Sequence, residues 1–344
     1  MIRQPSHKKS VLRSFAKQSS GVQRQGRLHR RAWMNASGLF AGLFLLLLWG
    51  GVTLYRHPQR VYLHGITMGM GYTVTAYGPR GMARHRVEKS VLDTFATVDR
   101  TLSTYRADSE LSKWNASRSF DLIHVSSVLF DILTLSQQLY VVSEGAWDGT
   151  AKPLFEAWGF SGLGMVKHVP TSQNIQLALA HVGFYRLNLI SPNLVQKRDS
   201  LVSVSLESVA PGYAVDLVAK QLEHLGYLNY SVEVGGQVKV KGKQVNGKLW
   251  RVEMGEGTFF ELTDKAIATS GKDRSFVSNG KRYSHVLNPR TGFPIVNGMS
   301  HVTVLADSCA LACGLNTALM VLGPQEGQIL LKRFPHTRAV FTLN

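Results

Sequence analysis

Residues 33–55 contain no charged side chain, and the centre of this segment, residues 39–49, is almost continuously apolar. In a bilayer, every backbone N–H and C=O of a single spanning segment must be paired within that segment, which restricts it to a helix. Its 23 residues reach the roughly 30 Å of the hydrocarbon core at about 1.5 Å per residue. We therefore predict a transmembrane helix over residues 33–55.

Basic residues are distributed unevenly on the two sides of this segment. The net charge is +17, but nine Lys and Arg residues fall within residues 1–31 and the first acidic residue is Glu88. Residues 1–32 are therefore predicted to be a disordered cytoplasmic tail, with the bulk of the chain translocated across the membrane. A cleaved export signal, with Arg30 and Arg31 as a twin-arginine pair, is the alternative. Nucleic-acid binding is disfavoured, because the excess charge is concentrated in the tail.

The remainder of the chain predicts a linker over residues 56–62 and one compact α+β domain over residues 63–344. Strand-like alternation and helical periodicity intermix there without a repeat or an internal linker. Strands are predicted over residues 61–65, 72–77, 200–206, 230–240 and 249–254, helices over 84–102, 125–142, 175–180, 212–225 and 311–322, and a loop over 145–160. Cys309 and Cys313 are predicted to be reduced, since helical side chains four residues apart rarely form a disulfide.

Residues 284–294 combine an imidazole (His285), a guanidinium (Arg290), two prolines and a Thr-Gly turn. Two interpretations are open: a tight connection with solvated polar groups, or part of a functional site. The segments around this stretch favour the second. Residues 268–271 (Ala-Thr-Ser-Gly) precede it, and residues 310–319, a small-residue helical segment, follow it.

In their order and spacing, these segments resemble the ApbE family, the FAD:protein FMN transferases. The resemblance extends over the whole predicted domain. Its other matching segments are residues 68–69, 103–105 (Ser-Thr-Tyr), 146–150 (Ala-Trp-Asp-Gly-Thr), 158–160, 212–216 (Gly-Tyr-Ala-Val-Asp), 235–236 and 250–252.

The resemblance implies a specific reaction. FAD is the substrate, and Mg²⁺ binds its pyrophosphate. The acceptor is a flavoprotein of a membrane redox complex, and the hydroxyl of one of its threonines attacks the FMN-side phosphorus. AMP is the leaving group. The FAD contacts carried over from the family are Met68, Tyr105, Ala146, Trp147, Asp148, Ser205, Pro211 and Leu287, and the metal positions are Ser208, Cys313, Asn316 and Thr317. His285 is a candidate general base or phosphate donor, with a structural, hydrogen-bonded histidine as the alternative.

Several of these positions depart from the family pattern. The family has acids where this chain has Ser205, Asn288, Cys313 and Asn316, and usually Lys or Glu where it has Pro211. Magnesium sites normally keep carboxylate ligands, and a thiol is a poor match for a hard cation. We therefore expect weak Mg²⁺ binding, with Glu207 or Asp307 as possible replacement ligands. Two functions remain open: a membrane-anchored transferase, and a catalytically degenerate member that binds flavin or acts as a scaffold.

Overall fold

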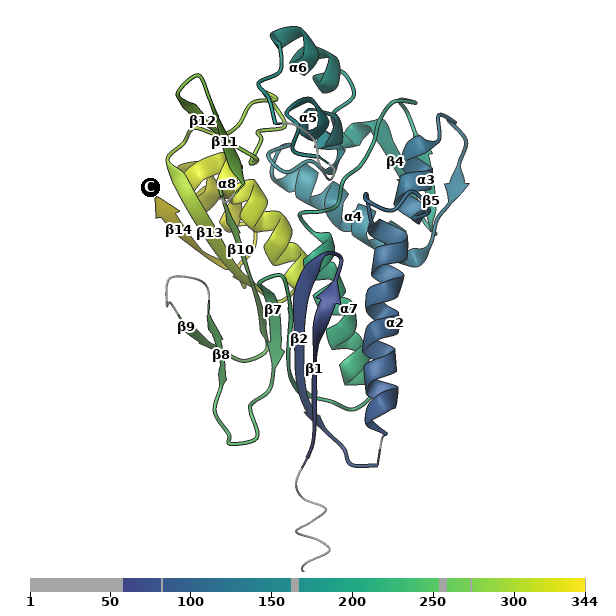
Figure 1. Cartoon of the computed structure of the whole chain (residues 1–344), viewed down its shortest axis with the longest axis vertical. Coiled ribbons are helices and arrows are strands. Elements are labelled where there is room, and N and C mark those ends of the chain that lie inside the picture. Colours follow the sequence, from purple (N-terminus) through teal and green to yellow (C-terminus); the bar gives the residue numbers. More distant parts are fainter. Residues whose placement is uncertain (1–57, 82, 162–166, 254–258, 273, 344) are drawn as a thin grey trace, which may run out of the picture. The chain divides into compact units, whose positions relative to one another are not determined.

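The computed structural model describes residues 58–343 apart from residues 82, 162–166, 254–258 and 273. Residues Gln59–Asn344 form one compact unit (Figure 1). The predicted tail and transmembrane helix, residues 1–55, lie outside the described residues. Within the described part of the chain, no helix has the length and apolarity needed to cross a membrane.

A seven-stranded antiparallel sheet in the order β1-β2-β6-β7-β10-β13-β14 forms the centre of this unit. Along most of its strands, buried side chains alternate with more accessible ones, as in a sheet with one well-covered face. Residues 266–268 are an exception, since all three are buried. The strands are β1 (Gln59–Thr67), β2 (Met70–Gly78), β6 (Asn229–Val234), β7 (Gln237–Lys241), β10 (Lys265–Gly271), β13 (Met299–Ala306) and β14 (Arg338–Leu343). β1 begins at Gln59, so the strand includes the last four residues of the segment 56–62 that was expected to be a linker.

Helices α7 and α8 pack on the central strands of this sheet, and α2 packs beside α7 (Figure 1). The apolar side chains of α2, at Val87, Val91, Phe95 and Val98, recur at helical spacing and are buried. The helices are α2 (Arg84–Leu102), α3 (Glu110–Ala116), α4 (Ser127–Val142), α5 (Lys152–Ala157), α6 (Ser172–Leu179), α7 (Ala210–His224) and α8 (Cys309–Leu331). α8 is kinked at Gly323, where φ is 75°, next to Pro324.

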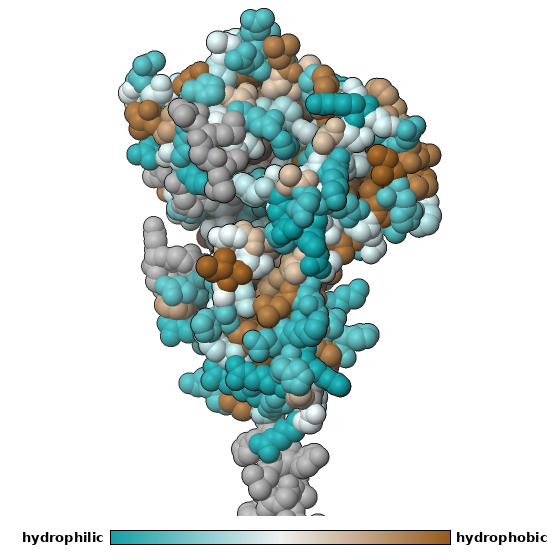
Figure 2. All heavy atoms as spheres, turned by 45° about the vertical axis from the view of Figure 1, so that its right-hand side comes forward, coloured by the Kyte–Doolittle hydropathy of each residue, from teal (hydrophilic) through white to brown (hydrophobic). Residues whose placement is uncertain are grey.

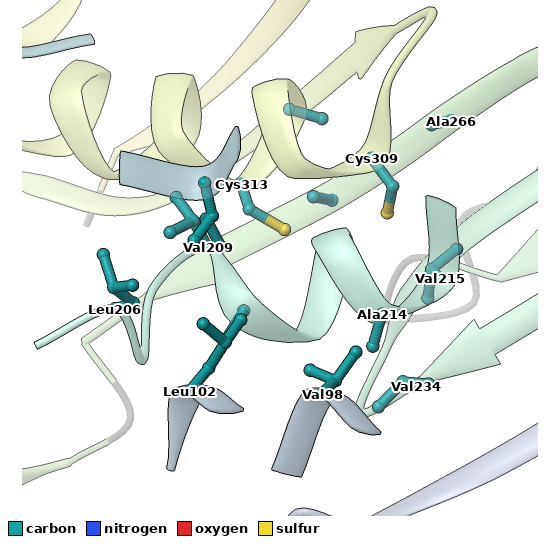
Figure 3. Close-up of a cluster of buried hydrophobic side chains, with 14 of the residues drawn as sticks. Val98, Leu102, Leu206, Val209, Ala214, Val215, Val234, Ala266, Cys309 and Cys313 are labelled. Carbon is teal, nitrogen blue, oxygen red and sulfur yellow. The ribbon is translucent and has the colours of Figure 1, made fainter. Parts of the chain in front are cut away.

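The main core fills the space where α2, α7 and α8 meet the sheet (Figure 3). In this view the Val98 and Leu102 side chains point from α2 toward α7. Gly212 allows α7 and α8 to approach each other closely, because a Cβ at this position would lie 2.6 Å from the backbone oxygen of Cys309. Cys309 and Cys313 are buried, as predicted, and no disulfide joins them in the described part of the chain.

Smaller elements surround this core. Leu154, Trp158 and Ile175 form a second apolar cluster around α5 and α6. Three of the remaining strands form a small sheet in the order β3 (Ile123–His124), β5 (Leu194–Lys197) and β4 (Leu187–Ile190). The other four form two hairpins, β8 (Trp250–Glu253) with β9 (Phe259–Leu262), and β11 (Ser275–Ser278) with β12 (Lys281–Ser284). The two short 3₁₀ helices are η1 (Gly149–Ala151) and η2 (Phe184–Arg186). On the face shown in Figure 2, hydrophobic residues lie in separate patches among hydrophilic ones.

Three further local predictions were wrong. Residues 145–160 are not only a loop, since they contain η1 and α5. Residues 200–206 alternate in polarity but form no strand; Asn115 instead binds the backbone N–H and C=O of Val204 through its side chain, at 2.8 Å each. Residues 230–240 form two strands, β6 and β7, joined at Gly235 and Gly236, both with positive φ.

Candidate functional site

A chamber of about 900 Å³ opens between the β1–β2 hairpin, the middle of α2 and the start of α7. Aromatic and aliphatic side chains dominate its lining: Met68, Tyr72, Leu92, Phe95, Leu102 and Tyr105. Tyr72 and Phe95 contact each other with ring centroids 4.8 Å apart. Tyr105 lies at the rim and is 51% exposed. This apolar chamber can accept a flat aromatic ring system.

A second chamber, of about 350 Å³, adjoins the first and is more polar. Residues from distant parts of the chain line it: Ala146, Trp147, Asp148, Ser205, Ser208, Thr269, Ser270, His285, Leu287, Cys313, Asn316 and Thr317. The two chambers share Met70, Glu207, Pro211 and Arg274, which we call the junction. All the site residues expected from the family resemblance therefore line one of two connected chambers.

Glu207 is held in place at the junction by two hydroxyl groups. Thr104 donates to one carboxylate oxygen at 2.7 Å, and the Tyr105 hydroxyl donates to the other at 3.0 Å. Partial burial and the neighbouring Glu207 carboxylate raise the pKa of Tyr105. The Ser-Thr-Tyr segment thus connects the rim of the apolar chamber to an acidic side chain at the junction.

His285 is fixed against the loop that carries Arg274. Its backbone N–H donates to the Arg274 carbonyl at 2.9 Å, and its Nδ1 lies 3.0 Å from the same oxygen. Because a carbonyl oxygen only accepts hydrogen bonds, Nδ1 is the donor and carries a proton. In the neutral imidazole the basic nitrogen is then Nε2, so the expected role as a proton acceptor is compatible with this orientation.

The turn that follows His285 is anchored to neighbouring elements. The Arg290 side chain donates to the backbone oxygens of Glu144 and Ser143, at 2.9 and 2.7 Å. Gly292 has φ +77°, and a Cβ there would lie 2.5 Å from the Ile175 side chain. Its carbonyl accepts a hydrogen bond from the Trp158 indole at 2.8 Å. Arg290 therefore has a structural role, and the turn places Leu287 at the polar chamber.

Asp148 is an ionisable side chain with little contact with water, since it is only 9% exposed. Oδ1 accepts hydrogen bonds from the Thr150 backbone N–H at 2.8 Å and from the Thr150 hydroxyl at 2.6 Å. Burial raises the pKa of Asp148 to about 6, against the opposing effect of these hydrogen bonds. Asp148 is therefore close to its protonation midpoint in mildly acidic solution.

Asp216 positions the helix that carries Cys313, Asn316 and Thr317. Its carboxylate accepts hydrogen bonds from the Ser308 hydroxyl and from the Cys309 and Ala310 backbone N–H groups, at 2.8, 3.1 and 2.9 Å. It also pairs with Lys239 at 2.7 Å. The Asp216 side chain, which belongs to α7, therefore caps the start of α8.

The donors at the expected metal positions do not suit a hard dication. Cys313 lies with its thiol 3.6 Å from the Gln237 side-chain oxygen, and the Thr317 hydroxyl donates to the Cys313 carbonyl at 3.1 Å. The Ser208 hydroxyl accepts from the Trp147 indole at 3.1 Å. None of these groups is a carboxylate, which a magnesium site normally includes. The described residues contain no cluster of three or more His, Cys, Asp and Glu side chains that could hold a metal.

The two possible replacement acids lie in different places. Glu207 borders both chambers, whereas Asp307 forms an ion pair with Lys265 at 2.5 Å and lines neither. Arg274 was missed by the sequence analysis. Its position three residues after Gly271, close to the Ala-Thr-Ser-Gly segment, was the available signal.

Comparisons with known proteins identify the family of this chain. The ApbE family model matches residues 68–341. The FAD:protein FMN transferase of Vibrio cholerae is 36% identical over 282 residues, which cover 79% of this chain and 84% of that protein, and the Salmonella typhimurium protein of the same name is 34% identical over 293 residues, covering 82% and 84%.

Solved structures of similar proteins show the same fold. The flavin transferase ApbE from Vibrio cholerae superposes with a TM-score of 0.77 at 34% identity, covering 83% of this chain and 94% of that one. The apo flavinyl transferase ApbE from Pseudomonas stutzeri gives a TM-score of 0.77 at 34% identity, with 84% and 92% covered. With the motifs gathered around two chambers and the match extending over most of its length, this chain belongs to the ApbE family.

Proposed function

We propose that this protein is a FAD:protein FMN transferase that modifies a threonine of an acceptor protein. The observation that carries the proposal is the convergence of motif residues from 68 to 317 on two connected chambers. FAD has two ring systems joined by a pyrophosphate, and two chambers with a polar junction suit that shape. The relatives at 32–36% identity carry this name, which supports the same activity here.

The proposed reaction replaces one phosphorus–oxygen bond with another. The threonine oxygen forms a bond to the FMN-side phosphorus, the bond from that phosphorus to the bridging oxygen breaks, and AMP leaves with that oxygen. The threonine proton must pass to a base, and His285 is the proposed acceptor. Its fixed Nδ1–H leaves Nε2 as the basic atom of the neutral ring. The Cys313, Asn316 and Thr317 side chains do not fit Mg²⁺, so no step is assigned to a metal.

We also propose where the reaction takes place. The uncharged segment 33–55 would anchor the protein in the bacterial inner membrane, with the basic tail in the cytoplasm and the ApbE domain in the periplasm. The acceptor would then be an exported flavoprotein domain or a subunit of a membrane redox complex. Its threonine would have to reach the junction from the rim at which Tyr105 lies.

A second candidate function is a catalytically degenerate flavin-binding or scaffold protein. The observation in its favour is the set of neutral side chains at Ser205, Cys313 and Asn316, where the family resemblance leads us to expect acids. Loss of several acids at one site is what relaxed selection on metal chemistry would produce. The apolar chamber would still be able to hold a flavin ring in such a protein.

One experiment separates the two candidates. The full-length protein in detergent is incubated with FAD and a threonine-bearing acceptor domain, and the acceptor mass and free AMP are measured. A transferase adds one FMN per acceptor with an equal amount of AMP, and gives neither product with an acceptor whose threonine is replaced by alanine. If FAD binds but neither product forms, the degenerate function is supported and the transferase is excluded for that acceptor.

A further inference from the structure

We infer that this protein binds the FAD pyrophosphate through Arg274 at the junction and does not require a divalent cation to do so. This inference rests on the proposed function, because it takes FAD as the ligand. It follows from the poor fit of the expected metal positions to Mg²⁺ and from the charged groups that border the two chambers. The pyrophosphate of FAD carries two negative charges, which need a positive partner when they leave water.

Arg274 has the right position for this role. Arg274 borders both chambers. Among the described residues that line the chambers, only Met70, Glu207 and Pro211 do the same. A ligand with one ring system in each chamber must place its linking group at this junction. Arg274 follows β10 and precedes β11, and its side chain is exposed. A guanidinium can bind phosphate oxygens through two parallel hydrogen bonds.

The other charged groups around the chambers are engaged elsewhere. Arg106 donates to Asp108 at 2.8 Å and to Asp99 at 3.2 Å. Asp148, which lines the polar chamber, accepts two hydrogen bonds from Thr150. The Arg274 side chain hydrogen-bonds to the Tyr105 hydroxyl. In the described part of the chain its guanidinium can therefore turn toward a phosphate without breaking ion pairs of the kind that hold Arg106.

Two further features support an anion at the junction. The Arg274 backbone is fixed by two hydrogen bonds to its carbonyl, from the backbone N–H and from Nδ1 of His285, which limits the positions open to its side chain. Helix α7 begins at Ala210, next to the junction residue Pro211, and both residues line the apolar chamber. The N-terminus of a helix of 15 residues favours a nearby negative charge.

Glu207 makes the inference testable, because it carries the opposite charge at the same place. If no cation mediates binding, the Glu207 carboxylate repels the pyrophosphate, and Glu207→Gln should strengthen FAD binding. If Glu207 instead holds a replacement Mg²⁺, the same substitution should weaken FAD binding. The amide is close in shape to the carboxylate and keeps an acceptor oxygen for Thr104 or Tyr105.

The experiment measures FAD and riboflavin binding to the full-length protein in detergent, by flavin fluorescence, with either EDTA or Mg²⁺ present. Riboflavin lacks the phosphates, so it serves as a control for the ring-binding chamber. We expect FAD affinities that agree within about threefold in EDTA and Mg²⁺. Arg274→Ala should weaken FAD binding by about tenfold, the typical effect of losing a charge-assisted hydrogen-bond pair, and leave riboflavin binding unchanged.

Two variants serve as matched controls. Arg282→Ala removes an exposed arginine of the adjacent hairpin, which donates to Ser275 at 3.0 Å and lines neither chamber, and should not change FAD binding. The double variant Cys313→Asp with Asn316→Asp restores two acids at the expected metal positions. It should gain Mg²⁺-dependent FAD binding, which shows that the assay detects a cation when one is used.

The possible outcomes separate this inference from the proposed function. FAD binding that is at least tenfold tighter with Mg²⁺ and is lost in Glu207→Gln would overturn the inference and leave the proposed function standing. Unchanged FAD affinity in Arg274→Ala would also overturn it. If the wild-type protein binds neither FAD nor riboflavin under any condition, the proposed function fails together with the inference.

Discussion

The Asp148→Asn substitution should stabilise the domain in neutral solution and lose that advantage in acid. Burial raises the pKa of Asp148 from 3.8 to about 6, so keeping this carboxylate ionised in the folded state costs about 3 kcal/mol. Asparagine keeps the Oδ1 acceptor for both Thr150 donors. Its amide nitrogen cannot accept from the Phe184 backbone N–H, which costs about 1 kcal/mol. The net gain above pH 7 should be about 2 kcal/mol.

The pH dependence follows from the direction of the shift. The pKa of Asp148 is higher in the folded state than in the unfolded state. Protonated Asp148 therefore contributes fully to the stability of the wild-type protein below pH 3.8, and this stabilisation is lost as the pH rises to about 6. Asparagine does not titrate, so the stability difference between variant and wild type should increase from about pH 4 to about pH 6 and be constant above that. Below pH 4 the variant should be slightly less stable than the wild type.

Urea unfolding of a fragment covering Gln59–Asn344, followed by tryptophan fluorescence at pH 4.5, 6 and 8, measures this difference. Asp121→Asn, at an exposed aspartate that hydrogen-bonds only to Ser119 among the contacts described, is the control. It should stay within about 0.5 kcal/mol of the wild type at each pH. A stability difference for Asp148→Asn that does not change between pH 4.5 and pH 8 would refute the reasoning.

Three further substitutions test the packing around the site by urea unfolding. Gly212→Ala should lower the free energy of unfolding by about 1–3 kcal/mol, because its Cβ would lie 2.6 Å from the Cys309 backbone oxygen. The control Gly71→Ala, whose Cβ would have no atom within 4 Å, should lower it less. An equal loss in the two variants would contradict the close approach of α7 and α8. Asp216→Ala should lower the free energy of unfolding by about 3 kcal/mol or more, since it leaves the start of α8 and Lys239 without their partner. A loss of stability below about 1 kcal/mol would show that the cap is unimportant. Arg290→Ala removes two hydrogen bonds to backbone oxygens and should cost about 1–3 kcal/mol, whereas unchanged stability would mean that the turn holds its shape without them.

Sequence periodicity predicted where the long helices lie, although α8 continues beyond its predicted end at residue 322, through the kink at Gly323. The spacing of Val87, Val91, Phe95 and Val98 gave a helix over residues 84–102, which is the observed extent of α2. The same approach failed over residues 200–206, whose side chains alternate in polarity although the segment pairs with no strand. The Asn115 side chain binds the backbone of Val204 instead. Pairing between distant residues of this kind leaves no local pattern in the sequence.

The candidate site was predictable to the extent that it is carried by short motifs. Residues such as Met68, Asp148, His285 and Asn316 were named from the family resemblance, and the structure brings them to two connected chambers. Arg274 was missed although it follows the Ala-Thr-Ser-Gly segment closely. The capping role of Asp216 could not be predicted, because it depends on how α7 and α8 meet in space. The chemical identities at the site could be read from sequence, but the partner of each group could not.

A crystal structure of the full-length protein with FAD, grown in EDTA, is the most direct test of the account. We predict difference density for one FAD per chain, with one ring system beside Tyr72 and Phe95 and the phosphate oxygens within hydrogen-bonding distance of Arg274. Density for FAD elsewhere on the domain would contradict the account. So would phosphates turned away from Arg274 in a crystal in which FAD is well ordered.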